Sequence, residues 1–232
     1  MNDRVVIVTG AGRGIGRAVC RRFAAAGARV VAAARSEDQL AETQDLIEAE
    51  GGQCSTMAVD VASSDRLRHL IETIDRRHGR IDVLVNNAGV IACGPVADLS
   101  AVEFENMLRV NVAAVFYASK FVWPVMKRQG GGTIVNVSSM AARDPFPTLG
   151  TYGACKRWVN GLTRGLADEG KEAGIRVFAV GPGAVWTDML RDNFPDVPKD
   201  QALDPADVAE TIFSLCQPAM AHASGQTFYI QK

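Results

Sequence analysis

Hydrophobic residues are distributed along the chain in two alternating patterns. Short runs are nearly continuous in Val, Ile and Ala, and between them lie longer segments with helical spacing of apolar positions. The first pattern is typical of parallel strands covered on both faces, and the second of amphipathic helices. The predicted strands are residues 4–9, 29–34, 53–59, 81–85, 133–138, 175–180 and 227–230. The predicted helices are residues 14–26, 37–50, 65–78, 102–129, 151–173 and 205–217.

The repeated order of strand, helix and strand predicts an α/β fold. We expect a single-domain, doubly wound (Rossmann-type) parallel sheet of about seven strands with helices on both faces. No linker or internal repeat divides the chain, so residues 1–232 are interpreted as one dinucleotide-binding and catalytic domain. The least regular segment, residues 182–204, contains three prolines. Long irregular segments in compact domains are usually functional, so we expect a substrate loop near residues 183–204.

Composition and charge exclude several classes of function. The chain is 47% hydrophobic and 22% charged, so it can bury a substantial core. Its net charge of -1 gives no basic excess for nucleic acid or an anionic membrane. The five cysteines and three histidines are scattered, without the spacing of metal ligands or a disulfide frame. We therefore expect reduced thiols, no metal, no nucleic-acid or membrane partner, and a cytoplasmic location.

A glycine-rich turn joins the first predicted strand to the first predicted helix. It reads Thr9-Gly10-Ala11-Gly12-Arg13-Gly14-Ile15-Gly16. Glycines allow a tight turn and close approach of the backbone to a pyrophosphate, while the helix N-terminus presents free N–H groups to the anion. A plain tight turn is the alternative, but the flanking strand and helix favour nucleotide binding. The candidate coenzyme residues here are Gly10, Gly12, Arg13, Gly14, Ile15 and Gly16.

The end of the second predicted strand indicates which dinucleotide is bound. An acidic residue at this place usually holds the ribose of NAD, whereas a 2′-phosphate calls for Arg. The chain reads Arg35-Ser36 there and has no acidic residue before Glu37, while Arg13 supplies a second cation. Two guanidinium groups suit a dianion, so NADP(H) is preferred and NAD(H) stays possible. The alternative is that both are solvated surface arginines.

The most informative motif for chemistry is Tyr152-Gly-Ala-Cys-Lys156. Residues four apart lie on one face of a helix, so the phenol and the ammonium point the same way. A nearby cation favours the phenolate and lowers the tyrosine pKa. Such pairs are common on ordinary surface helices, but Ser139 lies thirteen residues upstream, at the end of an apolar run. Ser138 is the rival to Ser139 and is interpreted as the end of the strand.

With these motifs in place, the chain resembles the short-chain dehydrogenase/reductase family over nearly its whole length. Its general shape is similar to the 3-oxoacyl-carrier-protein reductases. The motifs that carry the resemblance occur in order: Thr9 to Gly16, Asn86-Asn87-Ala88-Gly89, Asn111, Ser139, Tyr152-x-x-x-Lys156 and Pro182-Gly183. Two departures concern the substrate more than the chemistry. Gly181 stands where the family most often has Asn, and the C-terminus lacks the common Asp-Gly-Gly ending.

The resemblance implies hydride transfer between a nicotinamide and a carbonyl or secondary alcohol. It assigns Tyr152 as the general acid/base and Ser139 as the group that orients the substrate oxygen. Lys156 would bind the nicotinamide ribose and lower the pKa of Tyr152. Asn111 would support a water beside Lys156, unless it only faces a helix–helix contact. Further coenzyme contacts are expected from Asp60, Val61, Asn87, Ala88, Gly89, Pro182, Gly183, Val185 and Thr187.

Several of these assignments have structural alternatives. Asp60 is nearly as well explained as a turn residue, and Thr187 as the N-cap of a short helix. Cys93 and Cys155 flank the predicted site and are interpreted as ordinary buried thiols rather than a redox switch. Candidate walls of the substrate pocket are Met140, Arg143, Phe146 and Trp186.

The leading hypothesis is an NADPH-dependent reductase of a carbonyl compound, such as a 3-oxoacyl thioester or a small ketone. An NAD(P)-dependent alcohol or sugar dehydrogenase that runs in the oxidising direction is a second hypothesis. A non-catalytic dinucleotide sensor or scaffold is a third, because function does not follow from fold. The helices 102–129 and 151–173 carry apolar residues around much of their circumference. We therefore expect a homotetramer or homodimer.

Overall fold

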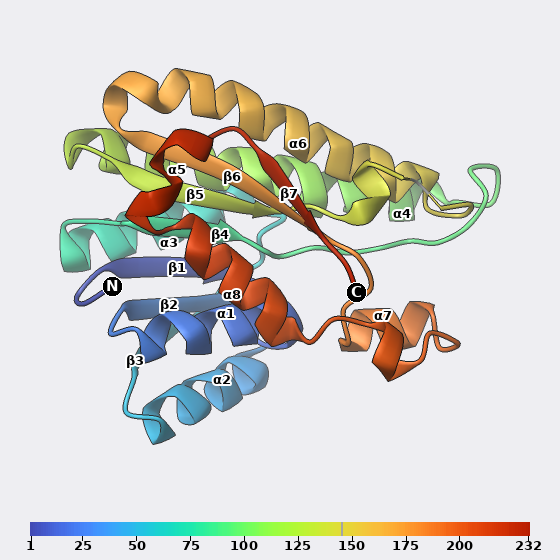
Figure 1. Ribbon diagram of the computed structural model, residues 1–232, viewed down its shortest axis with the longest axis horizontal. Helices are drawn as coiled ribbons and strands as arrows, with labels where there is room; N and C mark the ends of the chain where they lie inside the picture. The colour runs from blue at the N-terminus through green and yellow to red at the C-terminus, as the bar shows by residue number, and fades with distance from the viewer. Residues whose placement is uncertain (145) are drawn as a thin grey trace.

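A seven-stranded parallel sheet forms the centre of the protein, whose computed structural model describes residues 1–144 and 146–232 (Figure 1). The strand order is β3-β2-β1-β4-β5-β6-β7, so the winding reverses between β1 and β4. The strands are β1 (Val5–Thr9), β2 (Arg29–Ala34), β3 (Gln53–Ala58), β4 (Val83–Asn86), β5 (Gly132–Val137), β6 (Ile175–Pro182) and β7 (Thr227–Ile230). The predicted doubly wound fold class is confirmed.

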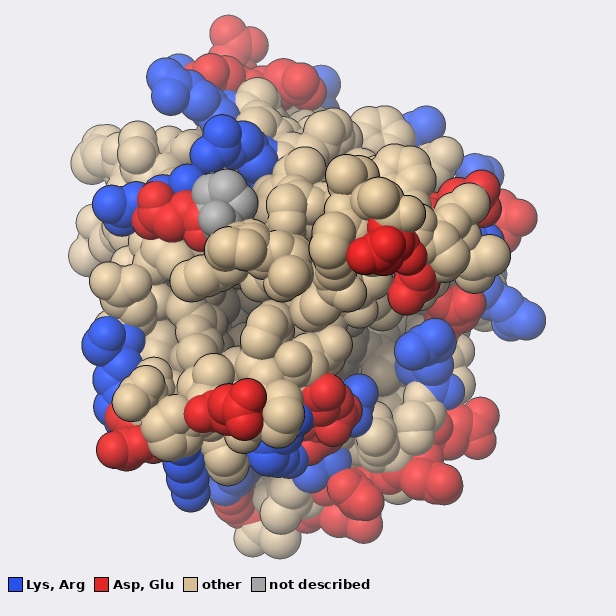
Figure 2. All heavy atoms as spheres, turned by 90° about the vertical axis from the view of Figure 1, so that its right-hand side faces the viewer, with Lys and Arg blue, Asp and Glu red and all other residues tan. Residues whose placement is uncertain are grey.

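All strands point the same way, so their carboxyl ends share one edge of the sheet. This edge lies on the right in Figure 1 and faces the viewer in Figure 2. Ligands of open α/β sheets bind outside the carboxyl ends, where the winding reverses. The topology therefore directs attention to the segments that follow β1, β4 and their neighbours.

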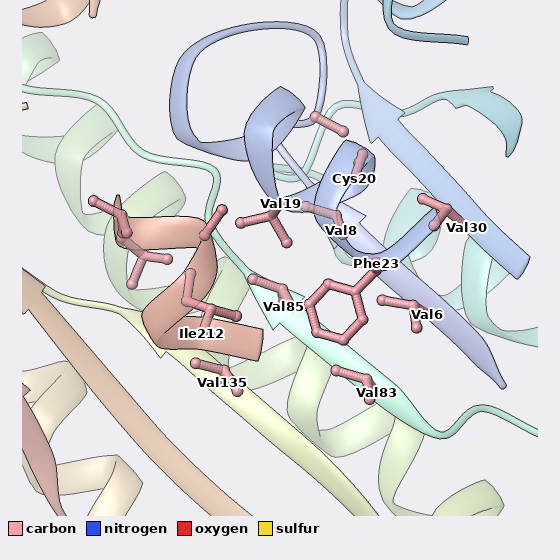
Figure 3. Packing of buried hydrophobic residues seen from close by; sticks show 14 of the residues in the cluster. Val6, Val8, Val19, Cys20, Phe23, Val30, Val83, Val85, Val135 and Ile212 are labelled. Carbon is pink, nitrogen blue, oxygen red and sulfur yellow. The ribbon is translucent and has the colours of Figure 1, made fainter. Parts of the chain in front are cut away.

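Alternate side chains of each strand enter two separate cores. Val6 and Val8 of β1 pack under α1 (Gly14–Ala25), α2 (Glu37–Ala49) and α8 (Pro205–Leu215). Figure 3 shows Phe23 of α1 lying among the valines of this core, close to Ile212 of α8. Val5 and Ile7 pack on the opposite face, under α3 (Ser64–His78), α5 (Ala114–Arg128) and α6 (Gly150–Gly170). A strand buried on both faces must be apolar at every position, which explains the continuous runs in the sequence.

Several helices begin or end at residue types that are typical of helix termini. The side chain of Ser36 accepts a hydrogen bond from Gln39 N at the start of α2. Asp204 and Asp207 form a reciprocal capping box at α8, with Pro205 at the first helical position. Gly27, at φ +80°, follows α1 in the left-handed conformation that glycine adopts freely. The predicted Asp204-Pro205 helix start is confirmed.

The long helix predicted over residues 102–129 is interrupted. The structure has α4 (Ala101–Leu108), one π-helical turn at Arg109–Ala113, and then α5. Asn111 lies in the π turn, so the prediction of a regular helix was wrong at this point. An inserted residue of this kind widens one helical turn, and such bulges frequently occur at functional sites.

The segment between β6 and α8 is more ordered than the sequence suggested. β6 extends to Pro182, and α7 (Asp188–Asn193) follows, with Thr187 as its N-cap. Val185 and Leu203 form a parallel β-bridge, which joins the two ends of the segment and closes it into a loop. Among the described residues, no helix combines the length and the apolar composition that a membrane crossing requires.

Candidate active site

A cleft of about 1000 Å³ opens at the carboxyl ends of the strands. It is lined by the glycine-rich turn, by the ends of β2 to β6, and by residues from the start of α6 and from α7. Figure 2 shows this face hollowed at its centre, with uncharged side chains next to the hollow and most of the charged side chains farther out. The volume lies at the upper end of the range for small-molecule sites.

The glycine-rich turn owes its shape to backbone that lacks side chains. Gly10 and Gly14 adopt φ of +65° and +54°, a region that other residues rarely enter. At Gly16 an added Cβ would lie 2.6 Å from Asn87 Nδ2 and closer still to the Gly10 carbonyl oxygen. Gly16 is therefore the floor of the turn rather than part of the cleft wall.

The end of β4 is tied directly to this turn. Asn87 Nδ2 donates to the carbonyl oxygens of Thr9 and Gly10, at 2.9 and 3.1 Å. The backbone N–H groups of Asn87 and Ala88 both donate to Thr9 Oγ1 at 3.1 Å. The two strands on either side of the winding reversal are thus held as one unit.

The two candidate arginines differ in their partners. Arg13 Nη1 lies 2.9 Å from a carboxylate oxygen of Asp188, at the start of α7, and Asp188 also pairs with Arg191. Arg35 follows β2, is exposed, and has no ion pair within residues 1–144 and 146–232. The expectation of two available cations therefore holds only for Arg35, because Arg13 is paired with Asp188. No local pattern in the sequence indicated that Asp188 would lie next to Arg13.

Asp60 and Val61 follow β3 and line the same end of the cleft. Asp60 Oδ1 accepts a hydrogen bond from Ala62 N at 3.0 Å, which is the turn that the alternative interpretation expected. Val61 is buried, and Ser36 caps α2 while facing the cleft.

Ser139, Tyr152 and Lys156 converge near the middle of the cleft. Ser139 follows β5, and its Oγ accepts a hydrogen bond from Ala141 N at 3.1 Å. Tyr152 and Lys156 lie one turn apart on α6, and both are buried. Lys156 Nζ donates to the Val137 carbonyl oxygen at 2.8 Å. Ser138 Oγ instead donates to the Lys156 carbonyl oxygen, so it holds α6 against β5.

The titration of this group is governed by burial. Burial raises the pKa of Tyr152 to about 12, although a hydrogen bond with Ser139 acts in the opposite direction. Burial lowers the pKa of Lys156 to about 8. The expectation that Lys156 depresses the tyrosine pKa was wrong in this structure. The ammonium lies 5.7 Å from the centre of the Tyr152 ring and is directed at Val137, while desolvation disfavours the phenolate.

Asn111 does not line the cleft but supports its wall. Its side chain accepts from Val90 N at 3.1 Å and donates to the Val90 carbonyl oxygen at 2.8 Å. An added Cβ at Gly89 would lie 3.1 Å from Asn111 Oδ1 and 3.6 Å from Lys156 Nζ. The π turn thus carries an amide that fixes the segment after β4 next to Lys156.

Pro182, Gly183, Val185 and Thr187 line the cleft opposite the glycine-rich turn. Thr187 Oγ1 donates to the Val185 carbonyl oxygen at 3.2 Å and accepts from Leu190 N at 3.4 Å. Thr187 is therefore an N-cap, as the structural alternative expected. An added Cβ at Gly14 would lie only 3.0 Å from Thr187 Cγ2, so the two sides approach closely here.

Tyr229 of β7 fills the space beside Gly181. An added Cβ at Gly181 would lie 2.6 Å from the Tyr229 ring and 3.3 Å from the Ser139 carbonyl oxygen. The Tyr229 hydroxyl accepts from Asn160 Nδ2 at 2.9 Å, one turn beyond Lys156 on α6. The atypical Gly181 and the C-terminal strand are thus complementary, which no local motif in the sequence indicated.

The cleft brings together all the predicted coenzyme and catalytic residues except Gly16 and Asn111. Of the candidate pocket walls, Met140 and Phe146 line it, and Arg143 and Trp186 do not. Sequence reasoning missed apolar lining residues that belong to no motif, among them Ile91, Leu149, Met189, Leu190, Phe194 and Val197. Within the described chain, no cluster of His, Cys, Asp and Glu has the arrangement of a metal site.

Comparisons with known proteins agree with this geometry. Residues 4–198 match the family model for short chain dehydrogenase. A 3-oxoacyl-[acyl-carrier-protein] reductase of Synechocystis is 35% identical, over 99% of this chain and 96% of the relative.

Two solved structures have the same fold. A 7α-hydroxysteroid dehydrogenase complexed with NADH and 7-oxo glycochenodeoxycholic acid superposes with a TM-score of 0.94 and 32% identity, covering 99% of this chain and 93% of the other. A variant of actinorhodin polyketide ketoreductase with NADPH superposes with a TM-score of 0.93 and 30% identity, covering 100% of this chain and 98% of the other. The chain therefore belongs to the short-chain dehydrogenase family, whose members are nicotinamide dinucleotide-dependent oxidoreductases that act on hydroxyl and carbonyl groups.

Proposed function

We propose that the protein is an NADPH-dependent carbonyl reductase in which Tyr152 is the general acid. The observation that carries the proposal is the meeting of Ser139, Tyr152 and Lys156 in the cleft that the glycine-rich turn also lines. The same groups, run in reverse, would oxidise a secondary alcohol. The segment 183–204 is proposed to bound the substrate side of the cleft.

The described residues fit a bound dinucleotide. The turn from Gly10 to Gly14 leaves its backbone exposed to the cleft at the N-terminus of α1, and the first turn of α1 contains no acidic residue. Free N–H groups and a positive dipole end favour a pyrophosphate at such a place. When bound, the coenzyme supplies the hydride, and the chain's own residues supply orientation and the proton.

The Tyr152 phenol is protonated at neutral pH, as a proton donor must be. Because the pKa of Tyr152 is about 12, the phenol is protonated and is a proton donor. Negative charge develops on the carbonyl oxygen as the carbon accepts hydride, and fixed donors stabilise that charge most in the transition state. Tyr152 donates its proton to this oxygen, and the Ser139 hydroxyl donates a hydrogen bond to it. Lys156, beside Gly89 and Asn111, is proposed to hold the nicotinamide ribose.

Replacing Tyr152 with Phe tests the proton-donor role. The change removes the hydroxyl and keeps the ring, so we expect kcat to fall by about a hundredfold to ten-thousandfold. The dissociation constant of NADPH, measured by coenzyme fluorescence, should stay within about twofold because the phenol donates to the substrate. Unchanged turnover in Tyr152→Phe would remove the role.

The preference for NADPH is supported by Arg35, an exposed cation at the end of β2 without an ion pair among the described residues. Replacing Arg35 with Ala should raise the dissociation constant of NADPH by about tenfold or more and leave that of NADH nearly unchanged. Arg77→Ala, at an exposed arginine in the last turn of α3 that neither lines the cleft nor forms an ion pair among the described residues, is the matched control. Equal losses for both coenzymes would refute the phosphate contact.

We further propose self-association through α4, α5 and α6, as a homodimer or homotetramer in the cytoplasm. These helices expose the large apolar side chains Val102, Phe104, Leu108, Phe116 and Trp158. An exposed apolar surface of this kind commonly marks an interface. Sedimentation of the wild type and of Phe116→Lys tests it: the wild type should sediment as an oligomer, and the variant should dissociate. A wild type that sediments as a 24.8 kDa monomer at micromolar concentration would contradict the proposal.

A further inference from the structure

The half of the cleft beyond Ser139 and Tyr152 has apolar walls. They come from three segments far apart in the sequence: the loop after β4, the segment between β5 and α6, and the segment that begins with α7. Phe194 also packs against the buried cluster that contains Leu149 and Tyr152. The walls are made by Ile91, Met140, Leu149, Met189, Phe194 and Val197.

The charged groups of the cleft lie elsewhere or are already engaged. Arg35 and Asp60 follow β2 and β3, at the coenzyme end. Arg13 and Asp188 pair with each other, and Lys156 is buried with its ammonium on the Val137 carbonyl oxygen. Among the described lining residues, no other side chain is charged. Figure 2 agrees, since uncharged residues surround the central hollow on this face.

The polar groups available to a substrate are also few. Ser139 and Tyr152 contribute hydroxyls to the lining of the cleft, whereas Ser138 Oγ is bound to the Lys156 carbonyl oxygen and Thr187 Oγ1 to that of Val185. A substrate with several hydroxyls would lose water there and gain no partner for most of them. A carboxylate would lose far more, because a buried charge without a partner is strongly disfavoured.

We propose that the substrate is an uncharged ketone, or the corresponding secondary alcohol, with an apolar carbon frame on which the reacting oxygen is the main polar group. The proposal rests on the proposed reductase function and specifies its substrate class. It excludes sugars, polyols and keto acids. Binding follows from the transfer of apolar surface into the pocket, while Ser139 and Tyr152 hold the single oxygen.

A series of cyclohexanones that differ only at carbon 4 tests the proposal. Reduction of the 4-methyl, 4-hydroxy and 4-carboxylate compounds is measured at saturating NADPH. We expect kcat/KM for the methyl compound to exceed that for the hydroxy compound by about tenfold and that for the carboxylate by about a hundredfold or more. The kcat/KM for the bicyclic 1-decalone should exceed that for the methyl compound by about tenfold, because the decalone buries more apolar surface. A carboxylate or hydroxy compound that matches the methyl compound would overturn the proposal.

A substitution in the apolar wall should change the preference of the enzyme between the methyl and the carboxylate compound. Met189→Lys places a cation in the apolar half, so the ratio of kcat/KM for the carboxylate to that for the methyl compound should rise by about tenfold or more. Leu46→Lys, at an exposed position on α2 outside the lining of the cleft, is the matched control and should leave the ratio unchanged. An unchanged ratio in a folded Met189→Lys protein would contradict the assignment of the wall.

A measurement of ligand binding, made without turnover, distinguishes an error in the substrate class from an error in the proposed reductase function. The thermal shift caused by each cyclohexanone is measured with NADPH on Tyr152→Phe, in which the proton donor is absent. If the methyl compound and the decalone stabilise this protein more than the carboxylate does, the substrate class stands even if the wild type reduces none of them. The absence of that order in binding would refute the substrate class whatever the activity.

Discussion

The two ends of the cleft are built by different means. At the coenzyme end, between β1, β2 and β4, the wall is mostly backbone: Gly10 and Gly14 take left-handed conformations, and Asn87 ties the turn to β4. At the substrate end, the wall is side chain, contributed by segments such as those around Ile91, Leu149 and Phe194. A backbone wall demands particular residues at fixed neighbouring positions. A wall of apolar side chains demands only suitable volume, which many sequences supply.

This difference predicts that the coenzyme end tolerates substitution least. Gly16→Ala is the sharpest case, because the new Cβ would lie 2.6 Å from Asn87 Nδ2 and would press on the Gly10 carbonyl. We expect a loss of about 3 kcal/mol in the free energy of unfolding, measured in denaturant, together with weaker coenzyme binding. Gly165→Ala on α6 is the control, since an added Cβ there meets nothing within 4 Å. That variant should gain about 0.5–1 kcal/mol from helix propensity.

The second prediction concerns the buried lysine between the two ends. The pKa of Lys156 is about 8 in the folded protein, against 10.5 as its ordinary value. Between these values the unfolded chain binds a proton that the folded protein does not, so stability must rise with pH in this window. From about pH 8 to about pH 10 the wild type should gain about 2 kcal/mol relative to Lys156→Met, measured by denaturant unfolding.

The comparison with Lys156→Met isolates the lysine. Both proteins share the buried thiols, whose raised pKa values act in the opposite direction, and both share Tyr152, whose contribution falls away only above its ordinary pKa of 10. These shared contributions cancel in the difference, except that of Cys155, whose pKa the neighbouring Lys156 lowers against the effect of burial. Parallel stability curves for the two proteins would show that Lys156 keeps its proton in the folded state.

The third prediction concerns Tyr229 at the substrate end. Removing the half-buried ring in Tyr229→Ala leaves a cavity beside Gly181 and loosens the backbone that carries Ser139. We expect a loss of about 1.5 kcal/mol in stability and a fall of about tenfold in kcat, with NADPH affinity unchanged. Tyr229→Phe keeps the ring and loses only the bond to Asn160, so it should retain most of kcat. Equal kcat losses in both variants would point to the hydroxyl instead of the ring.

The same contrast explains how far the sequence could be interpreted. The fold class and the glycine-rich turn follow from local patterns, because strand burial and tight turns impose residue types at short spacing. The π turn at Asn111 could not be predicted, since the Asn111 amide bonds to the backbone of Val90, which lies 21 residues away in the sequence. The Arg13–Asp188 pair and the packing of Tyr229 on Gly181 likewise join positions that no local pattern relates.

The smallest effect on stability is expected from a substitution in the ion pair between Arg13 and Asp188, which joins the two ends of the cleft. Both side chains are in contact with solvent, at 54% and 38% exposure, so Asp188→Asn should change stability by no more than about 0.5 kcal/mol. The substitution should nevertheless free Arg13, as well as Arg191, and remove a negative charge from the phosphate side of the cleft. We expect NADPH to bind about threefold more tightly by fluorescence titration at low salt, with less gain at high salt and little change for NADH.

Asp192→Asn is the matched control, because Asp192 lies on the same short helix and has no ion pair among the described residues. Asp192→Asn removes the same charge without releasing Arg13. An increase in NADPH affinity that both variants share would therefore come from the lost negative charge on α7 and not from the broken ion pair. A weaker affinity for NADPH in Asp188→Asn alone would reverse the interpretation. The pair would then serve to hold α7 over the coenzyme, and the substrate end would contribute to coenzyme binding through one side-chain contact.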